Sequence, residues 1–214
     1  MFKIVIALLA GLISASSWAA TYVYSGGNYT LLIGTTYDAS MRITGSFSTA
    51  NPLPANMPTT NIGPSGSNLV QTWNFNDGVN TYTPANSYIP SGPNVATDAG
   101  GNIATYAMNF FSPLPPHVIG TPMKSVTVNT SLSQATTGAP CTLLAVNTCT
   151  LVDPFAATGG FATSTVGGTF ILLATSIPIP ALTAWNLLLL GGLLVLLAAA
   201  VARSARPFVD GENT

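Results

Sequence analysis

The stretch LVQTWNFNDGVNTY, residues Leu69–Tyr82, decides the fold of this chain. Its Asp77-Gly78 pair supplies the positive φ angles of a tight turn, and the residues on either side are rich in aromatic and β-branched types. The pattern predicts a β-hairpin with strands over Leu69–Phe75 and Val79–Tyr82. Alternation along the first strand further predicts that the side chains of Trp73 and Phe75 are buried.

Similar patterns recur on both sides of this hairpin. Val95–Ala99 and Ile103–Phe111 flank Gly100-Gly101-Asn102 and predict a second hairpin, and Met41–Phe47 alternates apolar and polar residues. Further predicted strands are Tyr22–Tyr24, Tyr29–Ile33, Val118–Thr130, Thr142–Leu151 and Gly159–Ala174, the last broken by Gly167-Gly168. Links rich in Pro, Asn and Ser cover Asn51–Ser67, Thr83–Asn94 and Ser112–His117. Short strands with turn signals and no amphipathic helix predict a mainly β domain over residues 20–175, an antiparallel β-sandwich or a related barrel.

The chain is nearly uncharged, with 5% charged residues and 20 glycines among 214 residues. The predicted β-domain has net charge −2, from two basic residues and four aspartates: Arg42, Lys124, Asp38, Asp77, Asp98 and Asp153. Nucleic-acid binding needs several clustered Lys or Arg to neutralise phosphates, so this composition excludes it.

The amino end has the three parts of a secretory signal peptide. Lys3 provides the positive region, Ile4–Ile13 the apolar region, and Ser17-Trp18-Ala19 places small residues where signal peptidase reads them. We expect cleavage after Ala19, because cleavage one residue later would put Trp18 in a pocket that accepts small side chains. An uncleaved anchor or a buried helix is the alternative.

Export would place Cys141 and Cys149, the only two cysteines, in an oxidising compartment. In an oxidising compartment they are expected to form one disulfide, with the residues between them turning back as a small loop around Asn147. A metal pair or a catalytic thiol is the alternative, but two cysteines and one histidine do not make a zinc set.

The carboxyl end predicts a single transmembrane helix. Residues 181–202 carry no charge and are long enough to span about 30 Å of hydrocarbon as a helix. Trp185 lies at the outer end, and Arg203 and Arg206 follow the span, so the positive-inside rule places the tail, residues 203–214, in the cytoplasm. The expected location is the inner membrane, single pass, with the β-domain outside; a buried core helix is the alternative.

The entry to this span, Ile179-Pro180-Ala181-Leu182-Thr183-Ala184-Trp185, resembles the IPTL-CTERM sorting signal, a relative of the PEP-CTERM signals of Gram-negative bacteria. The resemblance covers about 30 residues: a Pro-containing motif, a Trp, a Leu-rich helix and a basic end. It implies handling by an exosortase, a membrane peptidase thought to cut near the motif, with release to the cell surface or extracellular matrix. Ala181 and Thr183 depart from the usual Thr and Ser of the motif.

Residues 176–180 form a Pro-rich segment before the span. Each proline keeps the residue before it extended, so this segment is expected to be an accessible protease site, a stiff stalk, or both.

The predicted β-domain also resembles uncharacterised domains joined to PEP-CTERM-type signals. The matching elements, in order, are Thr21–Ser25, Arg42–Phe47, Pro52–Asn56, Trp73–Gly78 and Thr97–Ile103. This resemblance implies export and a β fold, and it brings no activity and no site residue.

Few residues have side chains that could serve in catalysis or metal binding. His117, the only histidine, follows two prolines and is expected to be a surface or loop residue; a Ser-His-Asp triad is possible by composition but no motif supports it. Asp77 and Asp98 occupy turn positions, although Asp77 with Asn76, or Asp98 with Asn102, could bind calcium. No catalytic residue, metal or cofactor is predicted.

The leading hypothesis is therefore an exported, membrane-anchored surface or matrix protein without catalytic activity. The alternative is a polysaccharide-binding module, in which exposed aromatic side chains stack on sugars. The candidates for such a platform are Trp73, Tyr82, Tyr88 and Tyr106.

Overall fold

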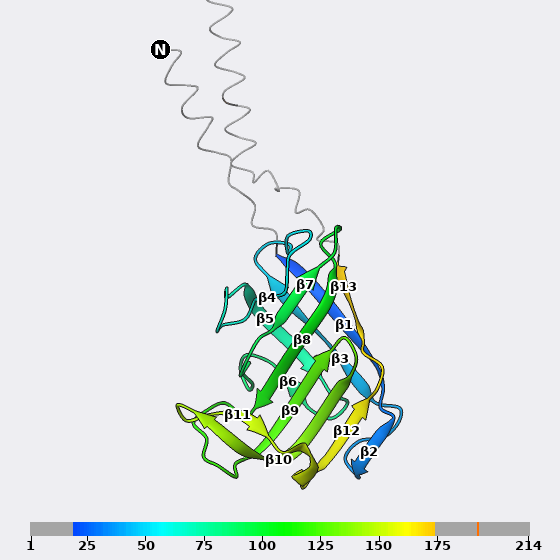
Figure 1. The fold of residues 1–214 in the computed structure, drawn as a ribbon, viewed down its shortest axis with the longest axis vertical. Coiled ribbons are helices and arrows are strands. Elements are labelled where there is room, and N and C mark those ends of the chain that lie inside the picture. The colour runs from blue at the N-terminus through cyan, green and yellow to red at the C-terminus, as the bar shows by residue number, and fades with distance from the viewer. Residues whose placement is uncertain (1–18, 174–191, 193–214) are drawn as a thin grey trace, which may run out of the picture. The chain divides into compact units, whose positions relative to one another are not determined.

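The computed structural model describes residues 19–173 and residue 192, and it shows two antiparallel β-sheets packed face to face (Figure 1). The strands are β1 (Ala20–Asn28), β2 (Leu31–Gly34), β3 (Arg42–Thr49), β4 (Thr60–Asn61), β5 (Val70–Asn76), β6 (Thr81–Tyr82), β7 (Asn94–Thr97), β8 (Ile103–Ser112), β9 (Pro122–Asn129), β10 (Ser133–Ala145), β11 (Thr148–Val152), β12 (Gly160–Ser164) and β13 (Thr169–Leu173). One short 3₁₀ helix, η1 (Pro154–Ala156), lies between β11 and β12. The predicted mainly β, sandwich-like fold is confirmed.

The smaller sheet has five strands in the order β13-β1-β3-β5-β6. Its register pairs Thr21 of β1 with Leu173 of β13, so both chain ends of the described domain leave from one end of the sandwich. Along β1 the large side chains of Tyr22 and Tyr24 point inward and are buried, as strand alternation requires.

The larger sheet has eight strands in the order β2-β12-β10-β9-β8-β7-β4, with β11 paired to the far half of β10. Strand β10 is the longest, with 13 residues. Its last residues run past the sheet, and with β11 they form a hairpin that projects at the end of the sandwich opposite to the start of β1 and the end of β13 (Figure 1).

Aromatic side chains from both sheets fill the core. The rings of Phe75 on β5 and Phe110 on β8 stack at 4.4 Å across the sandwich, and Tyr24 on β1 meets Tyr106 on β8 edge-on at 5.8 Å. Such pairs add roughly 0.5–1.5 kcal/mol beyond the burial of their apolar area. Phe75 is fully buried, which confirms the prediction, whereas Trp73 is only partly buried against this core.

The predicted hairpins are both present. β5 and β6 meet at the Asp77 turn, where Gly78 adopts φ 97°, and β7 and β8 meet at the Asp98 turn. The break at Gly167-Gly168 separates β12 from β13 as expected.

Two expectations for β10 and β11 are wrong. Thr142–Leu151 is not one strand but two, because Val146 and Asn147 both take positive φ, 47° and 59°, and reverse the chain. Residues 133–140, for which no strand was predicted, form the first part of β10. Their sequence SQATTGAP holds small and hydroxyl side chains, and it lacks the large apolar residues that usually indicate a strand.

Several predicted segments lie outside the described residues. These are the signal peptide except Ala19, the Pro-rich segment with the sorting motif, the span over residues 181–202 except Gly192, and the basic tail. Within the part of the chain that the structure describes, no helix is long and apolar enough to cross a membrane.

Candidate functional site

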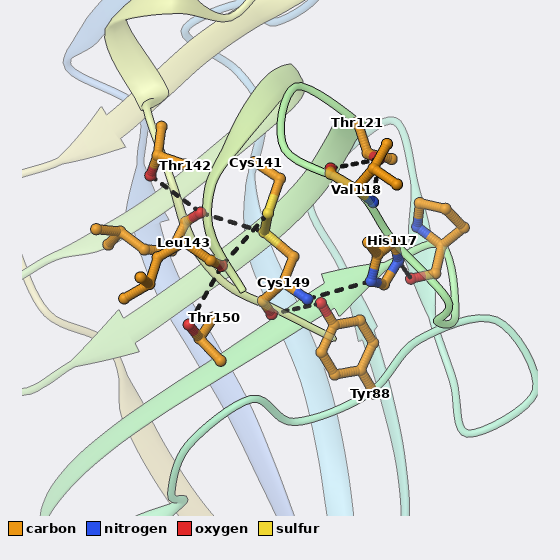
Figure 2. The surroundings of a disulfide bond; sticks show 11 residues. Tyr88, His117, Val118, Thr121, Cys141, Thr142, Leu143, Cys149 and Thr150 are labelled. Atoms are coloured by element: carbon orange, nitrogen blue, oxygen red, sulfur yellow. Dashed lines mark hydrogen bonds between the residues drawn. A yellow bond between two sulfur atoms is a disulfide. The ribbon is translucent and has the colours of Figure 1, made fainter. Parts of the chain in front are cut away.

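The end of the sandwich that the disulfide closes carries Cys141, Cys149 and His117, which are the only cysteines and the only histidine of the chain. Cys141 and Cys149 are bonded, with their Cα atoms 5.8 Å apart, which confirms the predicted pair (Figure 2). The disulfide belongs to a small second core on the outer face of the larger sheet, together with Phe111 and Met123. The bond links the two strands of the projecting β10–β11 hairpin, and its packing with Phe111 and Met123 holds the base of the hairpin against the sheet.

His117 lies under this disulfide and is buried, with 3% of its surface exposed. The backbone N–H of Cys149 donates to its Nδ1 (3.2 Å), and its Nε2 lies 3.1 Å from the Pro113 carbonyl oxygen, so Nε2 carries the proton. His117 lies in a loop, which is one of the two expectations, but it is not a surface residue, because both ring nitrogens serve as internal partners for backbone groups of the 113–121 loop and β11. A histidine used in this way holds two segments together.

Tyr88 completes the packing around His117. Its ring stacks on the imidazole at 5.5 Å, and its hydroxyl donates to the Cys149 carbonyl oxygen (2.6 Å). Burial raises the pKa of Tyr88 to about 12. The three aromatic groups Tyr88, His117 and Phe111 thus form a support for the hairpin rather than an exposed platform.

The outward side of the hairpin is apolar. Leu143 on β10 and Leu151 on β11 pair across the strands and are both about half exposed, and Val146 in the turn is 97% exposed. Val118 of the 113–121 loop lies on the other side of the disulfide (Figure 2), and both Val118 and its neighbour Ile119 are exposed. We call Leu114, Val118, Ile119, Leu143, Val146 and Leu151 the apolar tip.

Several polar groups at the apolar tip are bonded internally. The hydroxyls of Thr142 and Thr150 donate across the hairpin to the carbonyl oxygens of Leu151 and Leu143, at 3.2 and 3.3 Å. The backbone N–H of His117 donates to the Asn147 carbonyl oxygen at the turn (2.8 Å).

A second polar cluster lies deep in the sandwich, around Asp77. Its carboxylate accepts hydrogen bonds from the hydroxyls of Tyr37 and Tyr82 (both 2.9 Å) and from the Asn80 side-chain amide (3.1 Å). The backbone N–H groups of Val79 and Asn80 also donate to it. Asp77 is fully buried, so these five neutral donors replace the water that a carboxylate would otherwise bind.

The Asp77 cluster joins the two sheets. Tyr37 and Asn80 both lie within hydrogen-bonding distance of the Thr137 hydroxyl on β10, at 2.8 and 3.1 Å. Tyr29 donates to the Asp77 backbone carbonyl oxygen (2.8 Å). Burial, reinforced by the charge of Asp77, raises the pKa values of Tyr29, Tyr37 and Tyr82 far above that of free tyrosine. The sequence indicated the turn at Asp77 but not its role as a buried hydrogen-bond acceptor between the sheets. The only signal for that role was the number of tyrosines in a chain with so few charged residues.

Asp98 occupies the equivalent turn between β7 and β8 but is exposed. Its side chain accepts hydrogen bonds from the Asn102 amide and from the backbone N–H groups of Asn102 and Gly100, and these bonds lower its pKa. Both aspartates therefore serve their turns. Within residues 19–173, no three His, Cys, Asp or Glu side chains gather as a metal site.

The four aromatic residues considered for a sugar platform do not form one. Tyr82 and Tyr106 are buried in the main core, and the Trp73 ring packs inward, with its Nε1 donating to the Ser87 hydroxyl (2.9 Å). Tyr88 belongs to the second core described above.

The outer face of the smaller sheet offers a different surface, made of hydroxyl and amide groups. Neighbouring strands place Thr21, Ser48 and Thr72 in one row, and Val23, Ser46 and Asn74 in the next. A shallow hollow of about 320 Å³ lies on this face, and it is lined by Thr21, Ser46, Ser48, Thr72 and Asn74 together with Ala19, Phe47 and Trp73.

Comparison with known protein families, with curated proteins and with solved structures finds no match to this chain.

Proposed function

We propose that this chain is an exported cell-surface or extracellular-matrix protein, held by its carboxyl-terminal apolar segment, that acts by display and contact rather than by catalysis. The observation that carries the proposal is the Cys141–Cys149 disulfide. Disulfides persist in oxidising compartments, and the only two cysteines of the chain are used in this one bond.

The path of the chain supports the same proposal. β1 begins at Ala20, directly after the proposed signal-peptidase site, and Ala20 is buried and paired with Thr49. Because Thr21 pairs with Leu173, the chain leaves the domain where it enters, at the end opposite to the apolar tip.

The residues that could have carried chemistry have structural uses. His117 gives both ring nitrogens to backbone groups, and Asp77 receives five hydrogen bonds inside the core. These uses support a role in binding or display.

Cell fractionation tests this proposal. With an epitope tag inserted in the exposed turn at Gly120, we expect the protein in the envelope or medium, and its mass tells whether the segment after Leu173 is removed. Replacing the sorting motif Ile179–Trp185 with a Ser/Gly sequence should abolish any removal by an exosortase-type peptidase. A surface form that keeps Arg203 at steady state would contradict processing and leave simple anchoring, and tagged protein found in the cytoplasm would contradict export.

A second candidate function, contact with a neutral polysaccharide, is favoured by the hydroxyl-rich outer face of the smaller sheet. Its rows of Thr, Ser and Asn can exchange hydrogen bonds with sugar hydroxyls without an aromatic platform. Replacing Ser46 and Thr72 with Val should abolish retention on neutral polysaccharide gels if this face binds, and should leave it unchanged if it does not.

A further inference from the structure

The apolar tip differs from an ordinary protein interface because it is apolar on two sides. Leu143 and Leu151 lie side by side on the outward side of the hairpin, and Val118 lies on the other side of the disulfide (Figure 2). Val146 stands at the end of the hairpin, almost fully exposed. A flat partner surface covers only one side of such a projection, whereas a fluid apolar phase covers all of it.

We propose that the apolar tip inserts into the boundary between headgroups and acyl chains of a lipid surface without net charge. Backbone and hydroxyl groups that enter an apolar phase cost free energy unless they are hydrogen-bonded within the protein. Pairing between β10 and β11 satisfies the backbone groups that face each other across the hairpin, and the hydroxyls of Thr142 and Thr150 donate to carbonyl oxygens across the strands. At the turn, the Asn147 carbonyl oxygen accepts from His117.

The charge pattern selects the kind of lipid surface. Neither the 113–121 loop nor residues 131–152 contain a Lys, Arg, Asp or Glu residue. An anionic bilayer attracts basic residues by roughly 1 kcal/mol each near its surface, and the tip offers none. The tip is therefore matched to zwitterionic lipid, where only the burial of apolar area favours binding.

The turn residue Val146 is the second observation that indicates an external apolar partner. A β-branched residue at positive φ is strained, and Asn or Gly is the usual residue in such a turn. Inside the domain this valine covers almost nothing, since it is 97% exposed. Its side chain becomes favourable only when something outside the protein buries it.

Vesicle capture by the full chain tests the proposal. The chain is held on a sensor through a carboxyl-terminal tag, and protein-free phosphatidylcholine vesicles are passed over it. The tip variant carries Val146→Ser with Leu151→Ser, and the matched control carries Val166→Ser with Ile171→Ser, which are exposed apolar residues outside the tip. All forms keep the same carboxyl-terminal segment, so the difference between them reports the tip whether or not that segment is a membrane anchor.

We expect the tip variant to lose about tenfold or more in apparent affinity, and the control to stay within about twofold of wild type. Binding should be similar for vesicles with added phosphatidylglycerol and insensitive to salt. Equal capture by wild type and tip variant would overturn the proposal, as would capture that requires the anionic lipid. A tip variant that turns a dimer into a monomer without changing vesicle capture would instead assign the tip to a second copy of this chain.

Thermal unfolding and thiol titration verify that each variant is folded with its disulfide intact, and Val146→Asn replaces the double variant if that one does not fold.

Discussion

At the scale of single residues, Asp77 has the largest effect that the structure predicts. Its carboxylate is fully buried and receives hydrogen bonds from five neutral donors, among them two tyrosine hydroxyls. We expect Asp77→Asn to lower the free energy of unfolding by about 2–4 kcal/mol, because the new amide would face the Asn80 amide and the tyrosine hydroxyls as a donor among donors. Chemical denaturation of the purified protein measures the loss.

Asp98→Asn is the matched control for this prediction. Asp98 holds the equivalent turn of the next hairpin, but its carboxylate is exposed and water can replace the lost interactions. A loss as large as that of Asp77→Asn would contradict the importance we give to burial.

Sequence alone predicted the turns at Asp77 and Asp98 but could not distinguish the two aspartates. Asp77 directly precedes Gly78, and Asp98 lies two residues before Gly100, so both fit the same turn chemistry. What separates them is the arrival of Tyr37 and Thr137 from distant parts of the chain, which depends on how the sheets pack. The burial of His117 in its loop was not predicted for the same reason, since its partner Cys149 lies 32 residues away.

At the scale of elements, the β10–β11 turn is predicted to be stabilised by removing its valine. Val146→Asn should raise the free energy of unfolding by about 1 kcal/mol, because Asn tolerates the positive φ that strains a β-branched residue. The same change should weaken vesicle capture, because the apolar side chain is lost. Denaturant unfolding and the sensor assay, run on one preparation, verify that stability rises while vesicle capture falls. A loss of stability would contradict the strain at Val146.

The disulfide is predicted to stabilise the hairpin more than the body of the sandwich. Closing so short a loop contributes about 2.5 kcal/mol in the chain-entropy account. Replacing both cysteines with Ala should therefore expose amides of residues 141–152 to rapid hydrogen exchange, while those of β1, β3 and β8 stay protected. Uniform loss of protection across both sheets would show that the hairpin is not a separate unit.

Elements with alternating large side chains were predictable, and elements built from small ones were not. Arg42–Phe47 and Ile103–Phe111 alternate clearly, and both are strands. The residues 133–140 carry small side chains, and Thr136 on β10 bonds to Ser125 on β9 through hydroxyls. Such a strand owes its place to its neighbours rather than to its own composition.

At the scale of the whole molecule, the seven tyrosines make the fold sensitive to alkali. Burial raises the pKa of every one of them above the value near 10 that tyrosine has in an unfolded chain. A pKa that is higher in the folded state gives stability that is complete below about pH 10 and is lost as the pH rises through the folded value. Each tyrosine that ionises only on unfolding should lower the free energy of unfolding by roughly 1.4 kcal/mol per pH unit above pH 10.

Spectroscopic titration measures this directly. Tyrosinate absorbance should appear together with the loss of circular dichroism, in one cooperative step on the alkaline side of pH 10. Gradual ionisation near pH 10 in a protein that stays folded would contradict the burial of these tyrosines.

We propose that the whole chain is an exported protein with a disulfide-closed β-domain that is displayed from its carboxyl end. The most direct test is the intact mass of the native protein, isolated from its cells and alkylated without reduction. We predict a chain that begins at Ala20 and takes up no alkyl group on Cys141 or Cys149. A cytoplasmic form that starts at Met1 and carries two alkylated cysteines would contradict the account.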